Sequence, residues 1–321
     1  NWITTKMPDS HWLTEARMKG AQTVAVTVEY SATATKCDHV VVIRPGTDPA
    51  LALGVAQLVI AENRFDAAFV KRYTDLTSLV RMDTLERVRP SEIGAQVRRP
   101  SNWTHVVRDA YAAPAAIAQD GMYITEAMLG EFDGTVVWDA TSGVAVAVPR
   151  DAVGDRFDAL GVDPDLRGSH TVTIDGQSVE VRPVFSLVEE YLNANMTPAQ
   201  CQRITWAPEA AIRKMAELVS ENRGRTLFAC GMGPNQFFNQ DLKDRAVFLL
   251  ASLTGSVGRH GGNVGSYAGN YMTTLFGGIP KYTKEDPFHL QLRPDGPVHE
   301  HGYSRYESMH YWANGERLSK A

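Results

Sequence analysis

The sequence predicts an α/β protein, because short apolar strands alternate with helical stretches in two separate parts of the chain. Apolar runs without strict alternation, which are typical of parallel strands covered on both faces, occupy residues 23–27, 40–43 and 225–230. The second run precedes an amphipathic stretch over residues 50–63 that predicts a helix. We therefore expect doubly wound α/β units, in which helices cover both faces of a parallel sheet.

The two predicted units differ in what surrounds their strands. The first, residues 1–222, carries a peripheral insertion at about residues 81–183, where β-prone runs are separated by Pro, Gly and Asp. In that insertion Asp175-Gly176 lies between β-prone flanks, which is a strong signal for a hairpin turn. The second unit, residues 223–321, ends in a loop-rich segment from Thr273. The predicted fold is thus two Rossmann-like units with a β-containing insertion and a loop-rich C-terminal segment.

Composition excludes several classes of partner. The 321 residues include 37 acidic and 32 basic side chains, a net charge of -5, which offers no basic surface for nucleic acid or for an anionic membrane. No apolar run approaches the ~20 residues that a membrane-spanning helix needs. Cys37, Cys201 and Cys230 are too far apart for a CxxC metal clamp, so we expect small buried hydrophobic residues. Because the chain opens at Asn1 within what reads as a structured motif, we expect an internal piece of a longer protein.

Two predicted strands end in turns that suit a nucleotide. Ligands bind at the carboxyl edge of open α/β sheets, and an acid such as Glu29, just after a strand, can accept hydrogen bonds from ribose hydroxyls. In the Gly46-Thr47-Asp48 turn, Gly46 permits close backbone approach and Asp48 can accept two parallel hydrogen bonds from a guanine edge. From the sequence alone, a solvated turn carboxylate explains Glu29 better than a ribose contact, and an ordinary helix cap explains the Gly46-Thr47-Asp48 turn at least as well as a guanine contact.

A third turn and a glycine-rich stretch follow the strand at residues 225–230. The turn Gly231-Met232-Gly233-Pro234-Asn235-Gln236 lacks a full GxGxxG, but its Asn and Gln amides suit the donor and acceptor edge of a pterin. Residues 255–269 contain six glycines, each costing roughly 0.5–1 kcal/mol against Ala in regular structure, so this stretch is expected to wrap a ligand or to pass close to other backbone. The histidines match no metal-binding spacing, and we assign no metal ligand.

These segments together resemble the alpha subunits of respiratory nitrate reductases and nitrite oxidoreductases, which belong to the DMSO reductase family of molybdopterin oxidoreductases. The resemblance covers most of the chain and is weakest at about residues 98–171. The runs that carry it, in the order and context of the family, are Pro8 to Gly20, Thr23 to Tyr30, Cys37-Asp38, Pro45 to Asp48, Arg72 to Leu76, Gly231 to Gln236 and Gly258 to Gly269.

The resemblance implies a molybdenum ion held by two molybdopterin guanine dinucleotides. It implies that the molybdenum ligand and the ligands of a [4Fe–4S] cluster lie in the parent protein outside this chain, so no residue here is assigned to metal. The implied cofactor contacts are Asn1, Glu29, Gly46, Thr47, Asp48, Met232, Gly233, Asn235 and Gln236. No catalytic residue is assigned, and the implied lining of the substrate pocket is His260, Gly261, Gly262, Asn263 and Tyr267.

The implied reaction is the interconversion of nitrite and nitrate by oxygen-atom transfer with exchange of two electrons. The implied partners are an iron–sulfur beta subunit and a membrane or haem electron-transfer subunit in a membrane-associated complex, with a small oxyanion as substrate and no nucleic acid. The piece alone is expected to be inactive.

Three alternatives remain open from the sequence. One is a chlorate, selenate or related oxyanion reductase of the same family. A second, an NAD-dependent Rossmann dehydrogenase, predicts a GxGxxG turn after the first strand with an acid ~20 residues later, and the sequence has none. A third is a non-catalytic α/β binding module, which would scatter the turns over separate faces instead of one edge.

Overall fold

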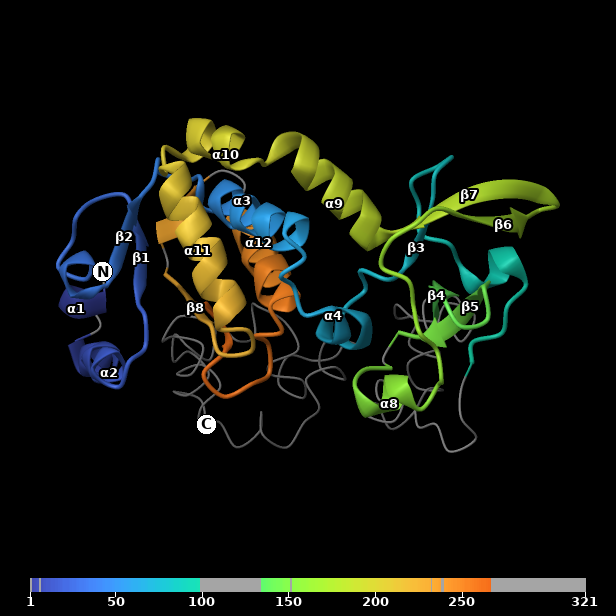
Figure 1. The fold of residues 1–321 in the computed structure, drawn as a ribbon, viewed down its shortest axis with the longest axis horizontal. Helices are drawn as coiled ribbons and strands as arrows, with labels where there is room; N and C mark the ends of the chain where they lie inside the picture. The colour runs from blue at the N-terminus through green and yellow to red at the C-terminus, as the bar shows by residue number, and fades with distance from the viewer. Residues whose placement is uncertain are drawn as a thin grey trace, which may run out of the picture. The chain divides into compact units, whose positions relative to one another are not determined.

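The computed structural model describes residues 2–5, 7–98, 134–150, 152–231, 233–237 and 240–266 (Figure 1). The chain divides into two units, and all described residues except Gly134 belong to the unit formed by residues 1–100 and 135–267. Helices and strands are mixed throughout that unit, so the predicted α/β class is confirmed. The expected loop-rich segment from Thr273 lies outside the described residues.

The N-terminal part contains the first parallel strand pair. After α1 (Trp2–Thr5) and α2 (Met7–Met18), β1 (Val24–Thr27) pairs in parallel with β2 (His39–Val42). Along the chain, a short 3-10 helix, η1 (Ala34–Lys36), follows β1 and precedes β2. Both strands agree with the predicted runs to within one residue, because each is marked by its local apolar pattern.

Asp38 joins the amino ends of these strands to α2. Its Oδ2 accepts hydrogen bonds from the backbone N (2.8 Å) and the hydroxyl (2.7 Å) of Thr23, and its Oδ1 accepts one from Nε of Arg17 (3.0 Å). The hydrogen bonds from Arg17 and Thr23 hold the pKa of the Asp38 carboxyl far below its ordinary value. The carboxylate therefore stabilises the fold at neutral pH.

Helix α3 (Asp48–Ala61) is the centre of the largest core. Most of its residues are buried, including Leu51, Val55 and Val59. Helices from the second half of the chain pack around it, as Figure 1 shows. They are α9 (Val184–Asn195), α10 (Pro198–Thr205), α11 (Glu209–Glu221) and α12 (Gln240–Leu253).

Close packing between α3 and α10 explains why position 54 is a glycine and why Cys201 is buried. Cys201 of α10 is fully buried, as expected for a small apolar residue, and its Sγ would lie 2.5 Å from a Cβ added at Gly54 of α3. Cys37 and Cys230 are only partly buried. All three cysteines are free thiols.

A second parallel pair joins β8 (Leu227–Cys230) to β9 (Asn263–Ser266). Leu227 lies opposite Asn263 at the amino end, and Cys230 opposite Ser266 at the carboxyl end. Strand β9 lies within the glycine-rich stretch, where the sequence predicts no strand. Pairing with a strand more than thirty residues earlier in the chain overrides the low strand propensity of Gly and Asn.

The predicted insertion is β-containing, as expected. Its sheet has the order β3-β7-β6, from β3 (Leu79–Arg81), β7 (Gln177–Pro183) and β6 (His170–Ile174), and a second sheet joins β4 (Gly134–Asp139) to β5 (Val144–Pro149). Asp175 (φ 51°) and Gly176 (φ 77°) are both left-handed, as a two-residue hairpin turn requires. One short helix, α4 (Ala67–Tyr73), precedes this region in the chain, and two more, η2 (Pro90–Ile93) and α8 (Asp155–Asp158), lie within it.

Candidate functional site

Two of the predicted turns are in contact at the carboxyl ends of β2 and β8. The first connects β2 to α3, and in it Gly46 has a left-handed φ of +78°. A Cβ at Gly46 would lie 3.2 Å from Cγ and 3.3 Å from Cβ of Phe237, at the end of the turn that connects β8 to α12. Segments almost 200 residues apart in the sequence therefore contact one another where the two separate strand pairs have their carboxyl ends.

The turn before α3 is closed by its own hydrogen bonds. Both the backbone N (3.2 Å) and the hydroxyl (2.6 Å) of Thr47 donate to the carbonyl of Arg44. Because its hydroxyl proton is used there, Thr47 is left with oxygen lone pairs and backbone groups for a ligand. Asp48 is the first residue of α3 and is half-buried. Burial raises the pKa of its carboxyl, and the hydrogen bond with its own backbone and, to a smaller extent, the charge of Lys243 oppose that rise.

Lys243 is a buried cation in the first turn of α12. Its side chain is only 2% exposed, and its Nζ lies 2.7 Å from Oδ1 of Asp244. Cys230 ends β8 and is half-buried. Burial raises the pKa of the Cys230 thiol, Lys243 lowers it, and Asp244 and Asp48 raise it further. The start of α3, the end of β8 and the start of α12 thus form one electrostatic cluster.

Lys243, Cys230 and Phe237 were not expected at this site from the sequence. A signal for Lys243 is present, because it stands at helical spacing from the buried residues Ala246, Leu250 and Leu253. A lysine in line with the apolar face of a helix is unusual, since Lys is almost never fully buried unless it is paired. Cys230 and Phe237 carry no comparable local signal.

Glu29 lies at the same edge of the β1–β2 pair as the Gly46 turn. The strands are parallel, and Ile43 N, just after β2, donates to the carbonyl of Thr27 at the end of β1 (2.8 Å). Glu29 itself is exposed, and its backbone N donates to the hydroxyl of Thr27 (3.3 Å). Its carboxylate is therefore open to solvent and to a ligand.

The turn after β8 contains a short 3-10 helix, η3 (Gly233–Gln236), in which Gly233 and Gln236 are exposed. The backbone of Asn235 belongs to this helix. Met232, Asn1 and Tyr267, which were also predicted to contact cofactor or substrate, lie outside the described residues.

The glycine-rich stretch is divided between the two ends of the β8–β9 pair. His260 and Gly261 are exposed and precede Asn263, which lies opposite Leu227 at the amino end. Gly233 and Gln236 follow the carboxyl end. The structure therefore does not bring these two predicted groups together. Ser266, the neighbour of Tyr267 in the sequence, pairs with Cys230 at the carboxyl end.

Gly262 has a packing role. A Cβ there would lie 3.0 Å from the carbonyl oxygen of Gly224 and even closer to that of Ser256. Both contacts are to backbone, so neither can be relieved by a change of rotamer. Of the two explanations that the sequence left open for this stretch, close passage of backbone is observed at this position.

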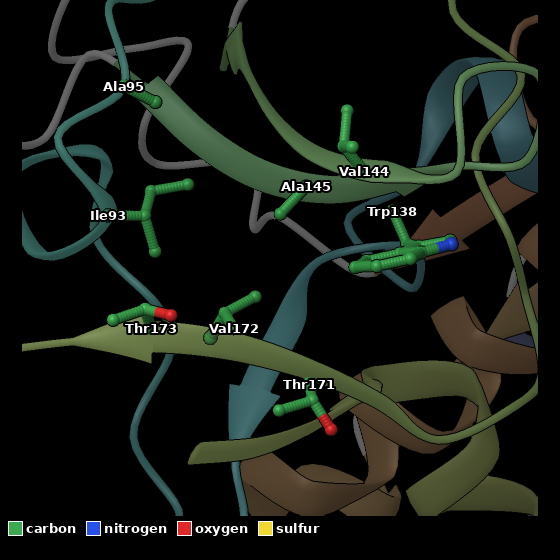
Figure 2. Close-up of a pocket in the computed structure, with 8 residues that line it drawn as sticks. All are labelled: Ile93, Ala95, Trp138, Val144, Ala145, Thr171, Val172 and Thr173. Atoms are coloured by element: carbon green, nitrogen blue, oxygen red, sulfur yellow. The ribbon is translucent and has the colours of Figure 1, made fainter. Parts of the chain in front are cut away.

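A pocket of about 260 Å³ lies in the insertion and contains none of the predicted site residues (Figure 2). Its walls are apolar side chains and threonines from η2, β4, β5 and β6. Trp138 lies in the wall and stacks on His170, with ring centroids 4.1 Å apart. The pocket is lined by Ile93, Ala95, Trp138, Val144, Ala145, Thr171, Val172 and Thr173.

The described residues offer neither a metal cluster nor a membrane-spanning helix. No group of three or more His, Cys, Asp and Glu side chains among them could hold a metal ion. Within the same part of the chain, no helix has the length and apolar character needed to cross a membrane.

Comparison with known proteins supplies the family. The sequence model of the molybdopterin oxidoreductases matches residues 4–306. The chain belongs to the molybdopterin oxidoreductase family. The resemblance noted from its motifs, and the oxidoreductase class that it implied, are thereby confirmed. The coarse cofactor prediction, molybdenum held by molybdopterin, follows from membership.

Individual relatives include alpha subunits that act on different oxyanions. The perchlorate reductase subunit alpha of Dechloromonas aromatica is 29% identical over 302 residues, which cover 87% of this chain and 29% of the relative. The respiratory nitrate reductase subunit alpha of Haloferax mediterranei is 30% identical over 278 residues, or 87% of this chain and 26% of the relative. The nitrate reductase alpha chain of Bacillus subtilis is 26% identical, and the match covers 83% of this chain and 25% of the relative. The chain thus spans less than a third of each relative's length.

The residues at the strand-end edge fit a pterin nucleotide. Asp48 offers a half-buried acceptor, Gln236 an exposed amide and Lys243 a buried positive charge. A guanine edge needs an acceptor pair, and a pterin needs mixed donors and acceptors.

Proposed function

We propose that this chain is part of the catalytic alpha subunit of an enzyme that interconverts nitrite and nitrate by oxygen-atom transfer, with a molybdenum–bis(molybdopterin guanine dinucleotide) cofactor. The observation that carries the proposal is the contact between Gly46 and Phe237, which joins the two strand-end turns at one edge. Open α/β sheets bind nucleotides at the carboxyl ends of their strands, and here the contact joins the carboxyl ends of two separate strand pairs. The proposal includes the finer fold description, in which the two parallel strand pairs belong to Rossmann-like units extending over residues 1–222 and 223–321.

Each polar group at the edge has a proposed role. Asp48 accepts hydrogen bonds from a guanine, Glu29 from a ribose, and the backbone of Gly46 and Thr47 lies against the nucleotide. The pterin end is assigned to Met232, Gly233, Asn235 and Gln236, and Asn1 to a further cofactor contact. When bound, the cofactor supplies the two-electron chemistry and exchanges the oxygen atom, while these residues orient it.

The substrate pocket is proposed to include His260, Gly261, Gly262, Asn263 and Tyr267. Support for the first four rests on the resemblance, because they stand at the amino end of β9 or before it. Support for Tyr267 rests on the resemblance alone, since this residue lies outside the described residues.

The parent protein is proposed to carry the molybdenum ligand and a [4Fe–4S] cluster in sequence beyond this chain. It would work with an iron–sulfur beta subunit and a membrane or haem electron-transfer subunit in a membrane-associated complex. The relatives' names, which call them alpha subunits, support an assembly of several subunits. The chain by itself is proposed to be inactive.

A perchlorate or chlorate reductase is the second candidate. The perchlorate reductase relative is 29% identical and the nitrate reductase relative 30%, a difference too small to choose a substrate. The family match gives no support to the NAD-dependent dehydrogenase considered from the sequence.

The parent protein, purified with its cofactor and partner subunits, decides between the candidates. Its kcat/KM is measured for nitrite oxidation and for reduction of nitrate, chlorate, perchlorate and selenate. We expect nitrite and nitrate to give the highest values in the two directions. Perchlorate or chlorate reduction at a higher kcat/KM than nitrate, without nitrite oxidation, would establish the second candidate.

A further inference from the structure

Trp206 is an exposed aromatic residue in a fixed and unusual backbone position. It follows α10, and its φ of +67° lies in the left-handed region, which an aromatic residue rarely adopts. Its neighbours Thr205 and Ala207 are fully buried, whereas 66% of Trp206 is exposed. The fold thus holds a tryptophan at the surface, in a conformation that glycine would adopt without strain.

Contacts place Trp206 beside the turn that precedes α3. The backbone N of Arg44 donates to the carbonyl of Thr205 (2.7 Å), and Cζ of Arg44 lies over the Trp206 ring, 5.8 Å from its centroid. The carbonyl of Arg44 accepts hydrogen bonds from the backbone N (3.2 Å) and the hydroxyl (2.6 Å) of Thr47. A single residue, Arg44, therefore links the ring to the turn that contains Gly46, Thr47 and Asp48.

The ring of Trp206 has a face that can receive a ligand. Arg44 lies over one face, and an exposure of 66% is too large for the other face to be covered as well. Arg44 is itself exposed, and no acidic side chain in the described part of the chain pairs with its guanidinium. Packing does not account for a ring that mostly contacts solvent. An open aromatic face beside a cation is suited to stack a base and to attract its phosphate group.

We propose that Trp206 is the stacking platform for the guanine base whose edge is assigned to Asp48, and that Arg44 fixes the ring and attracts the phosphate group. The identity of the ligand rests on the proposed function, whereas the position of the ring and the cation beside the turn does not. Asp48 contacts the edge of the base and gives selectivity for guanine. Trp206 covers its face and gives affinity for any purine, because every base has a π face.

The test measures binding of GMP, AMP and guanosine to the purified 321-residue chain by calorimetry. Quenching of tryptophan emission by GMP is recorded on the same proteins, because a base stacked on an indole ring quenches it. Trp12→Ala is the matched control, since Trp12 of α2 is 59% exposed and has no part in the site. The variants of the site are Trp206→Gly, Trp206→Phe, Arg44→Gln and Asp48→Asn.

We expect Trp206→Gly to weaken GMP and AMP binding by the same factor, about tenfold, the size expected for one base stacked on an aromatic ring. Trp206→Phe keeps a ring and should retain most of the affinity while losing the quenching that the wild type shows. Arg44→Gln should weaken GMP binding more than guanosine binding, because guanosine has no phosphate. Trp12→Ala should bind all three compounds as the wild type does.

Thermal denaturation separates a binding role from a structural one. Glycine adopts a left-handed φ without strain, so Trp206→Gly should unfold at the wild-type temperature or above it. A lower unfolding temperature together with weaker binding would make Trp206 a structural residue and overturn the proposal. Wild-type GMP affinity in Trp206→Gly would also overturn it, as would an equal loss in Trp12→Ala.

Asp48→Asn distinguishes failure of this proposal from failure of the proposed function. We expect this variant to weaken GMP binding and to leave AMP binding unchanged, because it alters the contact with the guanine edge. If the wild type binds GMP and AMP equally and Asp48→Asn changes neither, the guanine site fails, and an equal loss of both nucleotides in Trp206→Gly still establishes stacking. If the wild type binds neither nucleotide, the stacking platform and the proposed nucleotide site are both refuted.

Discussion

The two ends of the parallel strand pairs are built differently. At the amino ends, groups are closed by internal contacts: Asp38 joins Thr23 to Arg17 before β1 and β2, and Gly262 passes against the backbone of Ser256 before β9. At the carboxyl ends, Glu29 and Gln236 are exposed to solvent. Asp48 is half-buried, and the charge of Lys243 acts on its carboxyl group. The amino ends thus contribute stability, and the carboxyl ends carry the groups that can bind a ligand.

Two aspartates show the contrast most directly. The pKa of Asp38 is lowered by hydrogen bonds from Arg17 and Thr23, so its ionised form is stabilised by the fold. The pKa of Asp48 is raised by burial, so its ionised form is tolerated at a cost to the fold. A residue that is held in a less favourable state than in water is a candidate for a functional role.

The largest effect is expected at Gly262. Gly262→Ala places a methyl group against two backbone carbonyls, so we expect the free energy of unfolding to fall by about 3 kcal/mol, at the upper end of ordinary overpacking. Urea denaturation measures it. Gly265→Ala is the matched control, because no atom of the described part of the chain lies within 4 Å of a Cβ there, and it should change stability little. Equal losses in the two variants would contradict the account of this end.

Asp38→Asn should cost about 1–2 kcal/mol, because the hydrogen bonds from Arg17 and Thr23 are to a charged group. The folded pKa is depressed, so the contribution is fully present above the unfolded pKa of about 3.9 and is lost as the pH falls toward the folded value. Denaturation between pH 7 and pH 2 should therefore show a loss of stability below about pH 4 in the wild type that is smaller in the variant. Parallel curves would argue against this network.

Gly46→Ala tests the contact between the turns. A non-glycine residue in the left-handed region costs about 1–2 kcal/mol, and the new methyl group also presses on Phe237. We expect that loss in thermal denaturation together with weaker GMP binding. Phe237→Ala in the same chain should relieve the part that comes from the ring, which a double-mutant cycle measures. Strict additivity of the two substitutions would mean that the turns are not in contact in solution.

The smallest change in stability, with opposite sign, is expected for Asp48→Asn. Because the folded pKa is raised, the ionised form at pH 7 is less favourable in the folded state, and removing the charge should leave stability unchanged or increase it by up to about 0.5 kcal/mol. Guanosine affinity should nevertheless fall about tenfold with loss of an ionic acceptor. A destabilised variant with unchanged affinity would assign Asp48 to the structural class of Asp38.

Local features were predictable from the sequence and non-local ones were not. The strands at β1, β2 and β8, the helix at α3 and the Asp175-Gly176 turn carry their own signals in apolar pattern and turn chemistry. Strand β9 has no such signal, because two of its four residues are Asn and Gly and its pairing with β8 depends on the folded chain.

The candidate site was predictable in the same limited way. The rule for parallel sheets predicts that the turns after β2 and β8 each lie at a carboxyl end. The two strand pairs are separate sheets, so the contact of Gly46 with Phe237, which brings the two turns together, did not follow from that rule. Lys243 could have been found as a charged residue aligned with an apolar helix face. The glycine-rich stretch is divided between the two ends of the β8–β9 pair, and this division could not have been predicted. It follows from the register of β9, a strand that the sequence does not predict.

Photolabelling tests most directly whether the carboxyl ends of β2 and β8 form a nucleotide edge. The purified chain is irradiated with 8-azido-GMP, digested, and mapped by mass spectrometry, with and without excess GMP. The account predicts saturable labelling of the peptides that contain Gly46 to Asp48 and Gly233 to Phe237, suppressed by GMP and reduced in Asp48→Asn. Saturable labelling of the Trp138 pocket or of residues 260–263 instead, with no label at the two turns, would contradict it.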